Sequence, residues 1–425
     1  MKKGHRKISE RFRDSVSRRD FLKGAAALGV GAGLAGLPLR DARAAAAREV
    51  NVGVLYPTSG SQARFGQTCV DAAKLAAEDI NKAGGIKALG GAKINLVIAD
   101  IQSDATVTRN QAERLMTTAN LTAATGSYVS TYTLVATEVA ERYRIPYITG
   151  SIADAITGRG FKFTFEVSPK ASMFGHVQVD TVAWLEKQKK ARVAIVFEDT
   201  AYGTATSKGL HERAKEKGYE IPMMEPYTAA FTDATPLVNK IKAANVDVVF
   251  PVSYLTDAML IVRTMKQLNV NAAVVGGGAG YLMPEFQKGL GKDAEYVYSV
   301  GSWNYDINCP EVPKFAAEYE KRHGEFLQEH AGEAYVMLWV IADAIERAAS
   351  TDPVKVRDAM AKTDLRSGPG SAMPGCRVQF DETGWNKWVH PVMTQWQEGK
   401  LRTVYPGSDA RIKPIWPVPA WEKRR

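Results

Sequence analysis

Cysteine is scarce in this sequence, which has only three among 425 residues: Cys69, Cys309 and Cys376. Their spacing matches neither a zinc-binding pattern nor a C-x-x-C redox pair. The spacing therefore predicts no metal site built on cysteine. Two alternatives stay open for the thiols: all three are free and buried, or Cys309 and Cys376 pair in an oxidising compartment.

Motifs that carry catalysis or nucleotide binding are also missing. The sequence contains no H-E-x-x-H, no G-x-S-x-G and no P-loop pattern. The glycine run at 276–280 fails the dinucleotide-binding spacing, because Tyr281 stands where the third glycine belongs. The six histidines are scattered along the chain. We therefore predict that the protein is not an enzyme and uses no metal ion or cofactor.

Long apolar runs are absent, and the most apolar stretch, residues 24–37, is too short to span a bilayer comfortably. It follows the pair Arg18-Arg19 and ends near Ala42-Arg43-Ala44. Twin arginines, an apolar run and an A-x-A site in this order favour a twin-arginine signal peptide over an amphipathic helix or a membrane anchor. We predict that residues 1–44 are cleaved near Ala44, after the twin-arginine export machinery has delivered the protein to the periplasm.

The surplus of positive charge belongs mostly to this signal peptide. The chain has a formal net charge of +9, but residues 1–44 contain 11 Lys or Arg and 4 Asp or Glu. The signal peptide is therefore +7, and the mature part carries about +2. A mature chain this close to neutral lacks the basic surplus typical of nucleic-acid-binding proteins, so no nucleic-acid partner is predicted.

The mature chain, about 380 residues long, exceeds one ordinary hydrophobic core, so two lobes are expected. Apolar periodicity predicts alternating strands and helices, an order typical of a parallel, doubly wound sheet. The first strands fall at 50–55, 93–99, 121–125 and 145–148. Helices fall at 66–82, from the cap at 100–104 to about 119, and at 133–143. The pattern restarts with strands at 161–167, 192–197, 246–252 and 272–275 and a helix at 174–188. Helices at 313–322, 332–349 and 354–361 follow, and strands at 377–380, 389–397 and 401–404 close the chain.

Two polar loops follow neighbouring strands of the first lobe, at 126–131 and 149–152. In an open α/β sheet, ligands bind at the carboxyl ends of the strands. Small residues there leave backbone N–H groups bare, and a helix N-terminus adds partial positive charge. The loops fit a cradle for a small anion such as a carboxylate. On the loops alone, an ordinary pair of βα connections explains them equally well.

Loose motifs also recur along the mature chain: Val52-Gly53-Val54-Leu55, Ser59-Gly60, Phe65-Gly66, Ala77-Glu78-Asp79-Ile80-Asn81, Gly84-Gly85-Ile86, Ile145-Pro146, Arg159-Gly160, Tyr202-Gly203 and Phe380-Asp381 with Gly384. Their order and spacing resemble the type I periplasmic binding proteins. The chain looks most like the leucine/isoleucine/valine-binding group, which serves branched-chain amino acid ABC transporters. The resemblance covers nearly all of the mature chain.

The resemblance implies an α/β fold with two doubly wound, Rossmann-like lobes joined by three crossovers. Lobe one would comprise 48–168 and 303–376, and lobe two 169–302 and 377–425. The crossovers would lie near Ser168, at 301–304 and near Arg377. Such proteins close on a small-molecule ligand without chemistry, and an ABC permease with its ATPase subunits reads the closed form. A monomer is expected.

The resemblance also implies ligand-binding residues in the first lobe. In the family, a serine of the first loop and main-chain groups of the second hold the ligand's α-carboxylate. Ser130 matches that serine, and Gly150, Ser151 and Ile152 match the second loop. Ile152 would supply only its N–H, where the family often has threonine.

Three aromatic residues match family positions around the ligand. Phe65 matches a ring that covers it, and Tyr202 and Tyr254 match lobe-two tyrosines that close over it. Each has a plainer alternative, because a buried ring at a helix start or a strand end can be an ordinary packing residue.

Gly278 marks the main departure from the family pattern. The family acid that pairs with the ligand's ammonium group should fall near this glycine, and a buried ammonium without a carboxylate partner is costly. Either another acid substitutes, or the ligand is not an α-amino acid; the candidate acids are Asp257, Glu198 and Asp199. Our hypothesis leans toward a small carboxylate or amide and includes aromatic ones, because aromatic residues are candidates to line the site: Phe65, Phe174, Phe231 and Trp303.

The sequence thus predicts the periplasmic substrate-binding component of an ABC importer, with a small amino acid, carboxylate or amide as ligand. A ligand-sensing module of the same fold is one alternative. A redox enzyme exported by the twin-arginine route is another, which the missing cofactor motifs disfavour.

Overall fold

The computed structural model describes residues 49–187 and 190–424, so the predicted signal peptide at 1–44 lies outside the described residues. The described residues belong to one compact unit, and everything below concerns this unit. No helix within the described ranges is both long and apolar enough to cross a membrane.

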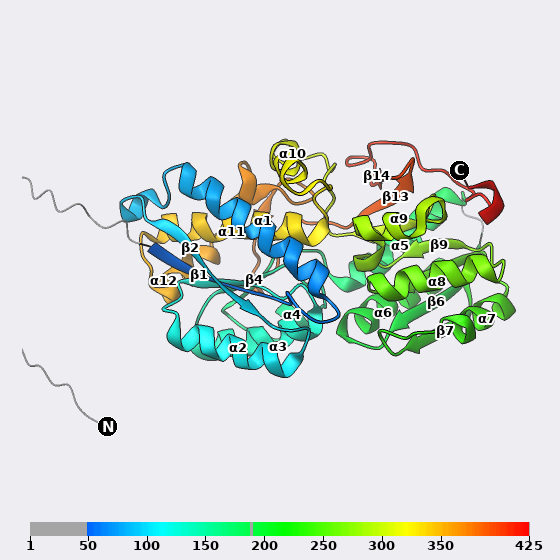
Figure 1. Cartoon of the computed structure of the whole chain (residues 1–425), viewed down its shortest axis with the longest axis horizontal. Coiled ribbons are helices and arrows are strands. Elements are labelled where there is room, and N and C mark those ends of the chain that lie inside the picture. The colour runs from blue at the N-terminus through cyan, green and yellow to red at the C-terminus, as the bar shows by residue number, and fades with distance from the viewer. Residues whose placement is uncertain (1–48, 188–189, 425) are drawn as a thin grey trace, which may run out of the picture. The chain divides into compact units, whose positions relative to one another are not determined.

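Five parallel strands form the first sheet, in the order β2-β1-β3-β4-β5 (Figure 1). They are β1 (Glu49–Tyr56), β2 (Lys93–Asp100), β3 (Ala123–Gly126), β4 (Tyr147–Thr149) and β5 (Thr164–Glu166). Alternate side chains of β1 bury against opposite helix layers, as the pleat requires. Val52 and Val54 join the core with α1 (Ala63–Lys82) and α11 (Glu329–Ala348), whereas Leu55 packs with α2 (Ala105–Thr118) and α3 (Ser130–Tyr143).

Seven strands form the second sheet, in the order β14-β13-β10-β9-β8-β6-β7. The parallel strands are β6 (Arg192–Glu198), β7 (Glu220–Tyr227), β8 (Val248–Val252), β9 (Ala273–Gly276) and β10 (Tyr298–Gly301). The strands β13 (Val392–Gln397) and β14 (Lys400–Tyr405) add an antiparallel edge. One face is covered by α5 (Ala171–Leu185) and α6 (Ala201–Glu216), the other by α7 (Thr235–Ala244), α8 (Leu255–Gln267) and α9 (Pro284–Leu290).

The chain passes between the two sheets three times: after β5, after β10 and before β13. Between the last two passes run α10 (Val312–His323), α11 and α12 (Pro353–Met360). The short strands β11 (Asp364–Leu365) and β12 (Val378–Gln379) pair with each other. Two doubly wound α/β sheets, each covered by helices and joined by three chain crossings, confirm the predicted fold class.

The predicted strands and helices of both sheets are present, but the sequence missed β7, β10, α7 and α9. The strand β7 is the outer edge of its sheet and contains Pro222 and Pro226. Proline removes a ladder hydrogen bond, which an edge strand tolerates, so the composition disguised this strand.

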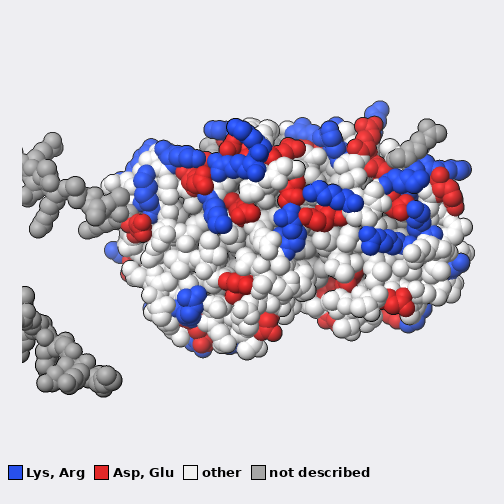
Figure 2. Space-filling view, in the orientation of Figure 1, with Lys and Arg blue, Asp and Glu red and all other residues white. Residues whose placement is uncertain are grey.

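The three cysteines are free, as the first of the two alternatives expects, but not all of them are buried. Cys69 and Cys309 are buried, and Cys376 is half-buried with its Sγ 3.1 Å from the carbonyl oxygen of Asn308. On the face shown in Figure 2, Lys and Arg side chains are interleaved with Asp and Glu. Among the described ion pairs, Arg322 joins both Glu78 and Glu318, at 2.8 and 2.7 Å.

Candidate functional site

The loops at the carboxyl ends of both sheets meet around a narrow space of about 20 Å³, which we call the inner chamber. One wall comes from the first sheet and from α11, and the opposite wall from the loops and helices of the second sheet. The lining residues, all buried, are Tyr128, Ser130, Gly150, Ile152, Phe174, Tyr202, Tyr254, Ala279, Glu329 and His330. Five of the eight residues predicted to bind ligand are among them.

Ser130 stands where β3 gives way to α3. The strand ends at Gly126, whose φ of +139° lets the chain pass so close to β1 that a Cβ would lie 2.0 Å from the carbonyl oxygen of Leu55. The helix then begins at Ser130 itself, so its first N–H groups point toward the chamber end of the sheet. The Oγ of Ser130 accepts a hydrogen bond from the N–H of Ala153 at 3.3 Å, which ties the two predicted loops together.

The second loop lies beside Ser130, but its three residues do different things. Ile152 lines the chamber, and Gly150 lets the loop approach α11, since a Cβ there would lie 2.4 Å from Oε2 of Glu333. The Oγ of Ser151 instead donates to the carbonyl oxygens of Ser127 and Tyr128, at 2.6 and 2.7 Å. The Ser151 side chain therefore does not line the chamber. Its hydroxyl holds the first loop in place instead.

Tyr202 and Tyr254 form much of the opposite wall, with ring centroids 5.4 Å apart. The start of α6 is set by Glu198, whose carboxylate accepts from the N–H groups of Thr200 and Gly203 at 2.8 and 2.7 Å. This places Tyr202 one residue into the helix, where its hydroxyl donates to the carbonyl oxygen of Gly277 at 2.6 Å. Burial raises the pKa of both phenols well above the ordinary value, so both stay neutral.

Gly278 does not line the inner chamber, although its neighbour Ala279 does. Its φ is +101°, and a Cβ would meet the ring of Phe174 at 3.0 Å. Its N–H donates to the Oγ of Ser299 at 3.1 Å. An acidic side chain has neither the backbone conformation nor the space at this position.

The three substitute acids have different surroundings. Glu198 is occupied by the start of α6, as described, and Asp199 is exposed. Asp257 is 2 % exposed, and burial raises its pKa to about 6. One of its oxygens accepts from the N–H of Ala230 at 3.0 Å, and the other has no partner among the described residues.

Asp257 and Phe65 belong to a second space, the outer chamber, with a volume of about 290 Å³. Tyr254 lines both chambers, so the two adjoin. The ring of Phe65 lies 5.0 Å from that of Tyr128 and 5.9 Å from that of His330. Phe65 thus backs the aromatic wall of the inner chamber from the outer side.

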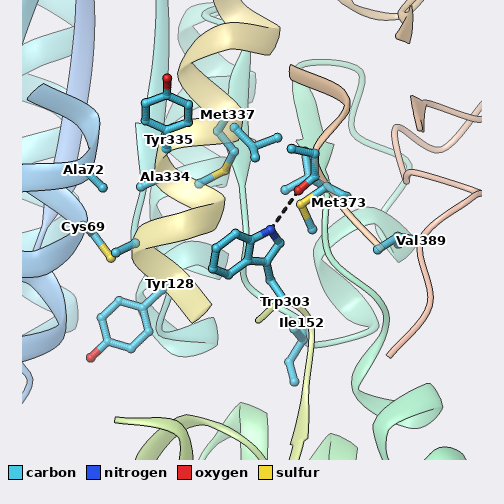
Figure 3. Close-up of a cluster of buried hydrophobic side chains, with 14 of the residues drawn as sticks. Cys69, Ala72, Tyr128, Ile152, Trp303, Ala334, Tyr335, Met337, Met373 and Val389 are labelled. Carbon is cyan, nitrogen blue, oxygen red and sulfur yellow. Dashed lines mark hydrogen bonds between the residues drawn. The ribbon is translucent and has the colours of Figure 1, made fainter. Parts of the chain in front are cut away.

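Of the other aromatic candidates, only Phe174 lines the inner chamber. Phe231 is half-buried and packs edge-to-face on Tyr227, with ring centroids 4.8 Å apart. Trp303 is fully buried beside α11, and its indole N–H donates to the carbonyl oxygen of Ala372 at 2.8 Å (Figure 3). Trp303 is a core residue.

Sequence reasoning missed the polar residues at the start of α11. The helix was predicted to begin at residue 332, where the apolar periodicity is clear, but it begins at Glu329. Glu329 and His330 were therefore treated as loop. The E-H-x-x-E spacing across residues 329–333 was the available signal, because it places Glu329, His330 and Glu333 within one helical turn.

These three residues form a buried cluster. The Oε1 of Glu329 accepts hydrogen bonds from the N–H of Ser302 at 2.5 Å and from its Oγ at 2.8 Å. The Oε1 of Glu333 accepts from the Oγ of Ser168 at 2.6 Å and from the Oγ of Ser302 at 2.5 Å. The Nδ1 of His330 lies 3.1 Å from Oε2 of Glu333. Burial raises the pKa of Glu329 to about 7. Burial lowers the pKa of His330, but both carboxylates outweigh it and the net shift is upward.

Two Rossmann-like lobes that present strand-end loops to a shared chamber define a type I periplasmic binding protein. The chain belongs to the periplasmic binding protein family, which matches residues 49–393. Residues 15–35 match the signal sequence of the twin-arginine translocation pathway, so the predicted export signal is confirmed and the protein is periplasmic.

Named relatives agree with this assignment. The chain is 31% identical to Leu/Ile/Val-binding protein homolog 7 of Brucella melitensis over an alignment of 400 residues. The alignment covers 90% of this chain and 96% of the relative. The fold is shared with the leucine-binding protein LivK of Thermotoga maritima, with a TM-score of 0.75 and 22% identity over 84% of this chain and 98% of that one. It is also shared with LivJ of Streptococcus pneumoniae, solved with isoleucine, with a TM-score of 0.74 and 24% identity over 84% of this chain and all of the other.

Proposed function

We propose that the protein is the substrate-binding component of an ABC importer of the branched-chain amino acid type. It captures a small amino acid, carboxylate or amide and performs no chemistry on it. A permease with its ATPase subunits receives the ligand-bound, monomeric protein. The observation that carries this proposal is the inner chamber, where Ser130 and Ile152 of one wall face Tyr202 and Tyr254 of the other.

In this scheme the ligand's carboxylate rests against the start of α3. The Oγ of Ser130 and the backbone of Gly150 and Ile152 supply polar groups at that point, and the helix N-terminus adds partial positive charge. Tyr202 and Tyr254 cover the ligand from the second sheet. Ser151 supports the first loop and does not contact the ligand.

Opening and closing of two lobes is part of the proposal. All residues that line the inner chamber are buried, so a solute reaches it only when the walls separate. Lobe one would hold the first sheet with α10, α11 and α12, and lobe two the second sheet. Since β12 pairs with β11 and Trp385 bridges to Glu166 of β5, we place the third crossover at 389–391 rather than near Arg377.

The direct test is a thermal-shift screen of the mature protein against amino acids, amides, and aliphatic and aromatic acids. A ligand present at a hundred times its dissociation constant adds about 2.7 kcal/mol to the free energy of unfolding, which raises the melting temperature by a few degrees. We expect one chemical class to stabilise the protein. If no class does, the proposed function is wrong.

A variant of Ser130 tests whether a compound that stabilises the protein binds in the inner chamber. Ser130→Ala removes one hydroxyl from the carboxylate position, and we expect affinity to fall about tenfold, since a hydrogen bond to a charged group contributes about 1.5 kcal/mol. Ser207→Ala is the matched control, because Ser207 is also buried but, among the described residues, its Oγ bonds only the carbonyl oxygen of Thr204 within α6. Equal affinities of both variants and the wild type would exclude Ser130 from the site.

A further inference from the structure

The charge of the inner chamber distinguishes among the ligand classes left open above. Glu329 is 3 % exposed and contributes a carboxylate to the lining, and none of the described lining residues is Lys or Arg. A ligand that is only an anion would enter a buried space that already holds negative charge. Such an arrangement is costly, because like charges in a poorly solvated site repel strongly.

The cation nearest to Glu329 is already shared. The imidazole of His330 lies between two carboxylates, with Nε2 3.5 Å from Oε2 of Glu329 and Nδ1 3.1 Å from Oε2 of Glu333. One imidazole cannot pair fully with two carboxyl groups at once. No other described side chain that lines the chamber is basic, so a second positive group would have to come from the ligand.

Glu329 also has bonding capacity to spare. Its Oε1 accepts both hydrogen bonds from Ser302, whereas its Oε2 accepts none within the described part of the chain and meets only the imidazole of His330, with Nε2 at 3.5 Å. Rings of Tyr128, Tyr202 and Tyr254 line the same chamber. Aromatic faces beside a carboxylate suit an ammonium group, because the ring quadrupole attracts a cation that the carboxylate also pairs.

We propose that Glu329 holds the α-ammonium group of the ligand, which is therefore an amino acid. This inference rests on the proposed function and narrows its ligand class. The hypothesis that the ligand lacks an amino group rested on the acid missing at Gly278. In this proposal Glu329 of α11 takes the place of that acid, so the hypothesis loses its basis. Asp257, the remaining candidate acid, lies in the outer chamber.

The replacement changes which lobe holds the charged end of the ligand. The helix α11 packs against α1 and against β3 and β4 of the first sheet. Glu329 and Ser130 therefore lie on the same side of the chamber, and the second sheet contributes mainly the rings of Tyr202 and Tyr254. The open protein can engage both charges of an amino acid before the second wall closes.

Matched ligand pairs test the inference in the wild-type protein. Mature protein is titrated calorimetrically with L-leucine and with 4-methylpentanoate, which lacks only the amino group, and with L-phenylalanine and 3-phenylpropanoate. At least one amino acid should bind about 100-fold more tightly than its partner without the amino group, the cost of leaving a buried carboxylate unpaired. Equal or tighter binding of the acids would overturn the inference while leaving the proposed function intact.

The variant Glu329→Gln tests the residue. Glutamine keeps one oxygen for Ser302, so the fold is expected to survive, and an unchanged melting temperature without ligand verifies this. The variant should lose about 100-fold in affinity for the amino acid and nothing for the acid. A retained preference for the amino acid in this variant would contradict the assignment.

Two further variants separate Glu329 from other buried acids. Glu295→Gln is the matched control, because Glu295 is 4 % exposed and accepts from the N–H groups of Glu398 and Gly399, at 2.8 and 2.7 Å, away from both chambers. It should keep the wild-type preference. Loss of the preference in Asp257→Asn but not in Glu329→Gln would assign the ammonium site to Asp257 and overturn the inference. Absence of binding by every compound would count against the proposed function itself.

Discussion

Single glycines decide how closely the elements around the chamber approach one another. Gly332 of α11 faces the indole ring of Trp303, and a Cβ there would lie 2.5 Å from two ring atoms. Gly150 likewise leaves space for the side chain of Glu333. Both glycines have ordinary backbone conformations, so what requires them is space rather than φ.

The Gly332→Ala variant should therefore destabilise the protein. Alanine favours a helix over glycine by about 1 kcal/mol, but overpacking a filled core costs about 1–3 kcal/mol. Trp303 is fully buried and held by its hydrogen bond to Ala372, so the ring cannot easily yield. We expect a net loss of up to about 2 kcal/mol in the free energy of unfolding, measured by urea denaturation.

Gly158→Ala provides the control. Gly158 ends the short helix α4 (Ala155–Gly158), and no atom lies within 4 Å of the position of its Cβ. This variant should match the wild type or exceed it by up to about 1 kcal/mol. If Gly332→Ala proved as stable as Gly158→Ala, the described packing of Trp303 would be incorrect.

At this scale the sequence predicted some chamber residues and missed others for physical reasons. Ser130 and Ile152 were identified through the family resemblance, because they stand on loops at strand ends that match the family's ligand-binding loops; the loops alone did not single them out. Glu329 and His330 were missed because polar residues at a helix start do not show in the apolar periodicity. The role of the Ser151 hydroxyl depends on contacts with residues 24 and 23 positions earlier in the chain, which no local pattern reveals.

At the scale of elements, α11 connects two of the segments that pass between the sheets. The Oε1 of Glu333 accepts from Ser168, which follows β5, and from Ser302, which follows β10. One carboxylate thus holds both segments at the level of the chamber. Any movement of one wall relative to the other must rearrange or preserve these bonds.

A second buried carboxyl group, Glu166 at the end of β5, joins neighbouring elements. Its Oε2 accepts from Thr157 of α4 at 2.9 Å and pairs with Lys170, which precedes α5, at 2.5 Å. Burial nevertheless raises its pKa to about 7, and Lys170 only partly offsets this. The folded protein therefore binds a proton at Glu166 more tightly than the unfolded chain does.

This shift predicts a pH dependence of stability. A carboxyl group whose pKa is raised by folding contributes stability below its unfolded pKa, near 4.5, and loses that contribution as pH rises through about 7. Glu166→Gln removes the titration. The free energy of unfolding of the wild type, relative to this variant, should fall by about 3 kcal/mol between pH 4.5 and 7.

The measurement is a series of urea denaturation curves across this pH range. Glu78→Gln is the control, because Glu78 is exposed and its pKa is lowered by Arg322. That control should follow the wild type over the same range. A pH-independent difference between wild type and Glu166→Gln would show that Glu166 is already ionised in the folded protein.

Elements with strong apolar periodicity were predicted well, and the others were not. The strands of the first sheet and the helices α1, α10, α11 and α12 were found within a few residues. The edge strand β7 was missed because its prolines and its exposed side chains resemble a loop. Its position depends on pairing with β6, which is a property of the sheet and not of the segment.

At the scale of the molecule, charged side chains join the helices of the two sheets beside the outer chamber. Arg64 of α1 pairs with Glu285 of α9 and with Glu325, which follows α10. Arg64 also lines the outer chamber. Its side chain is partly exposed, so this ion-pair group can form and break at low cost as the walls move.

The central claim is that the two walls separate to admit a solute and close around it. Small-angle X-ray scattering of the mature protein measures this directly, with and without a saturating concentration of the strongest stabiliser from the thermal-shift screen. We predict that ligand reduces the radius of gyration, because closure brings Tyr202 and Tyr254 against the wall that carries Ser130. A saturated protein with an unchanged radius of gyration would contradict capture by closing lobes.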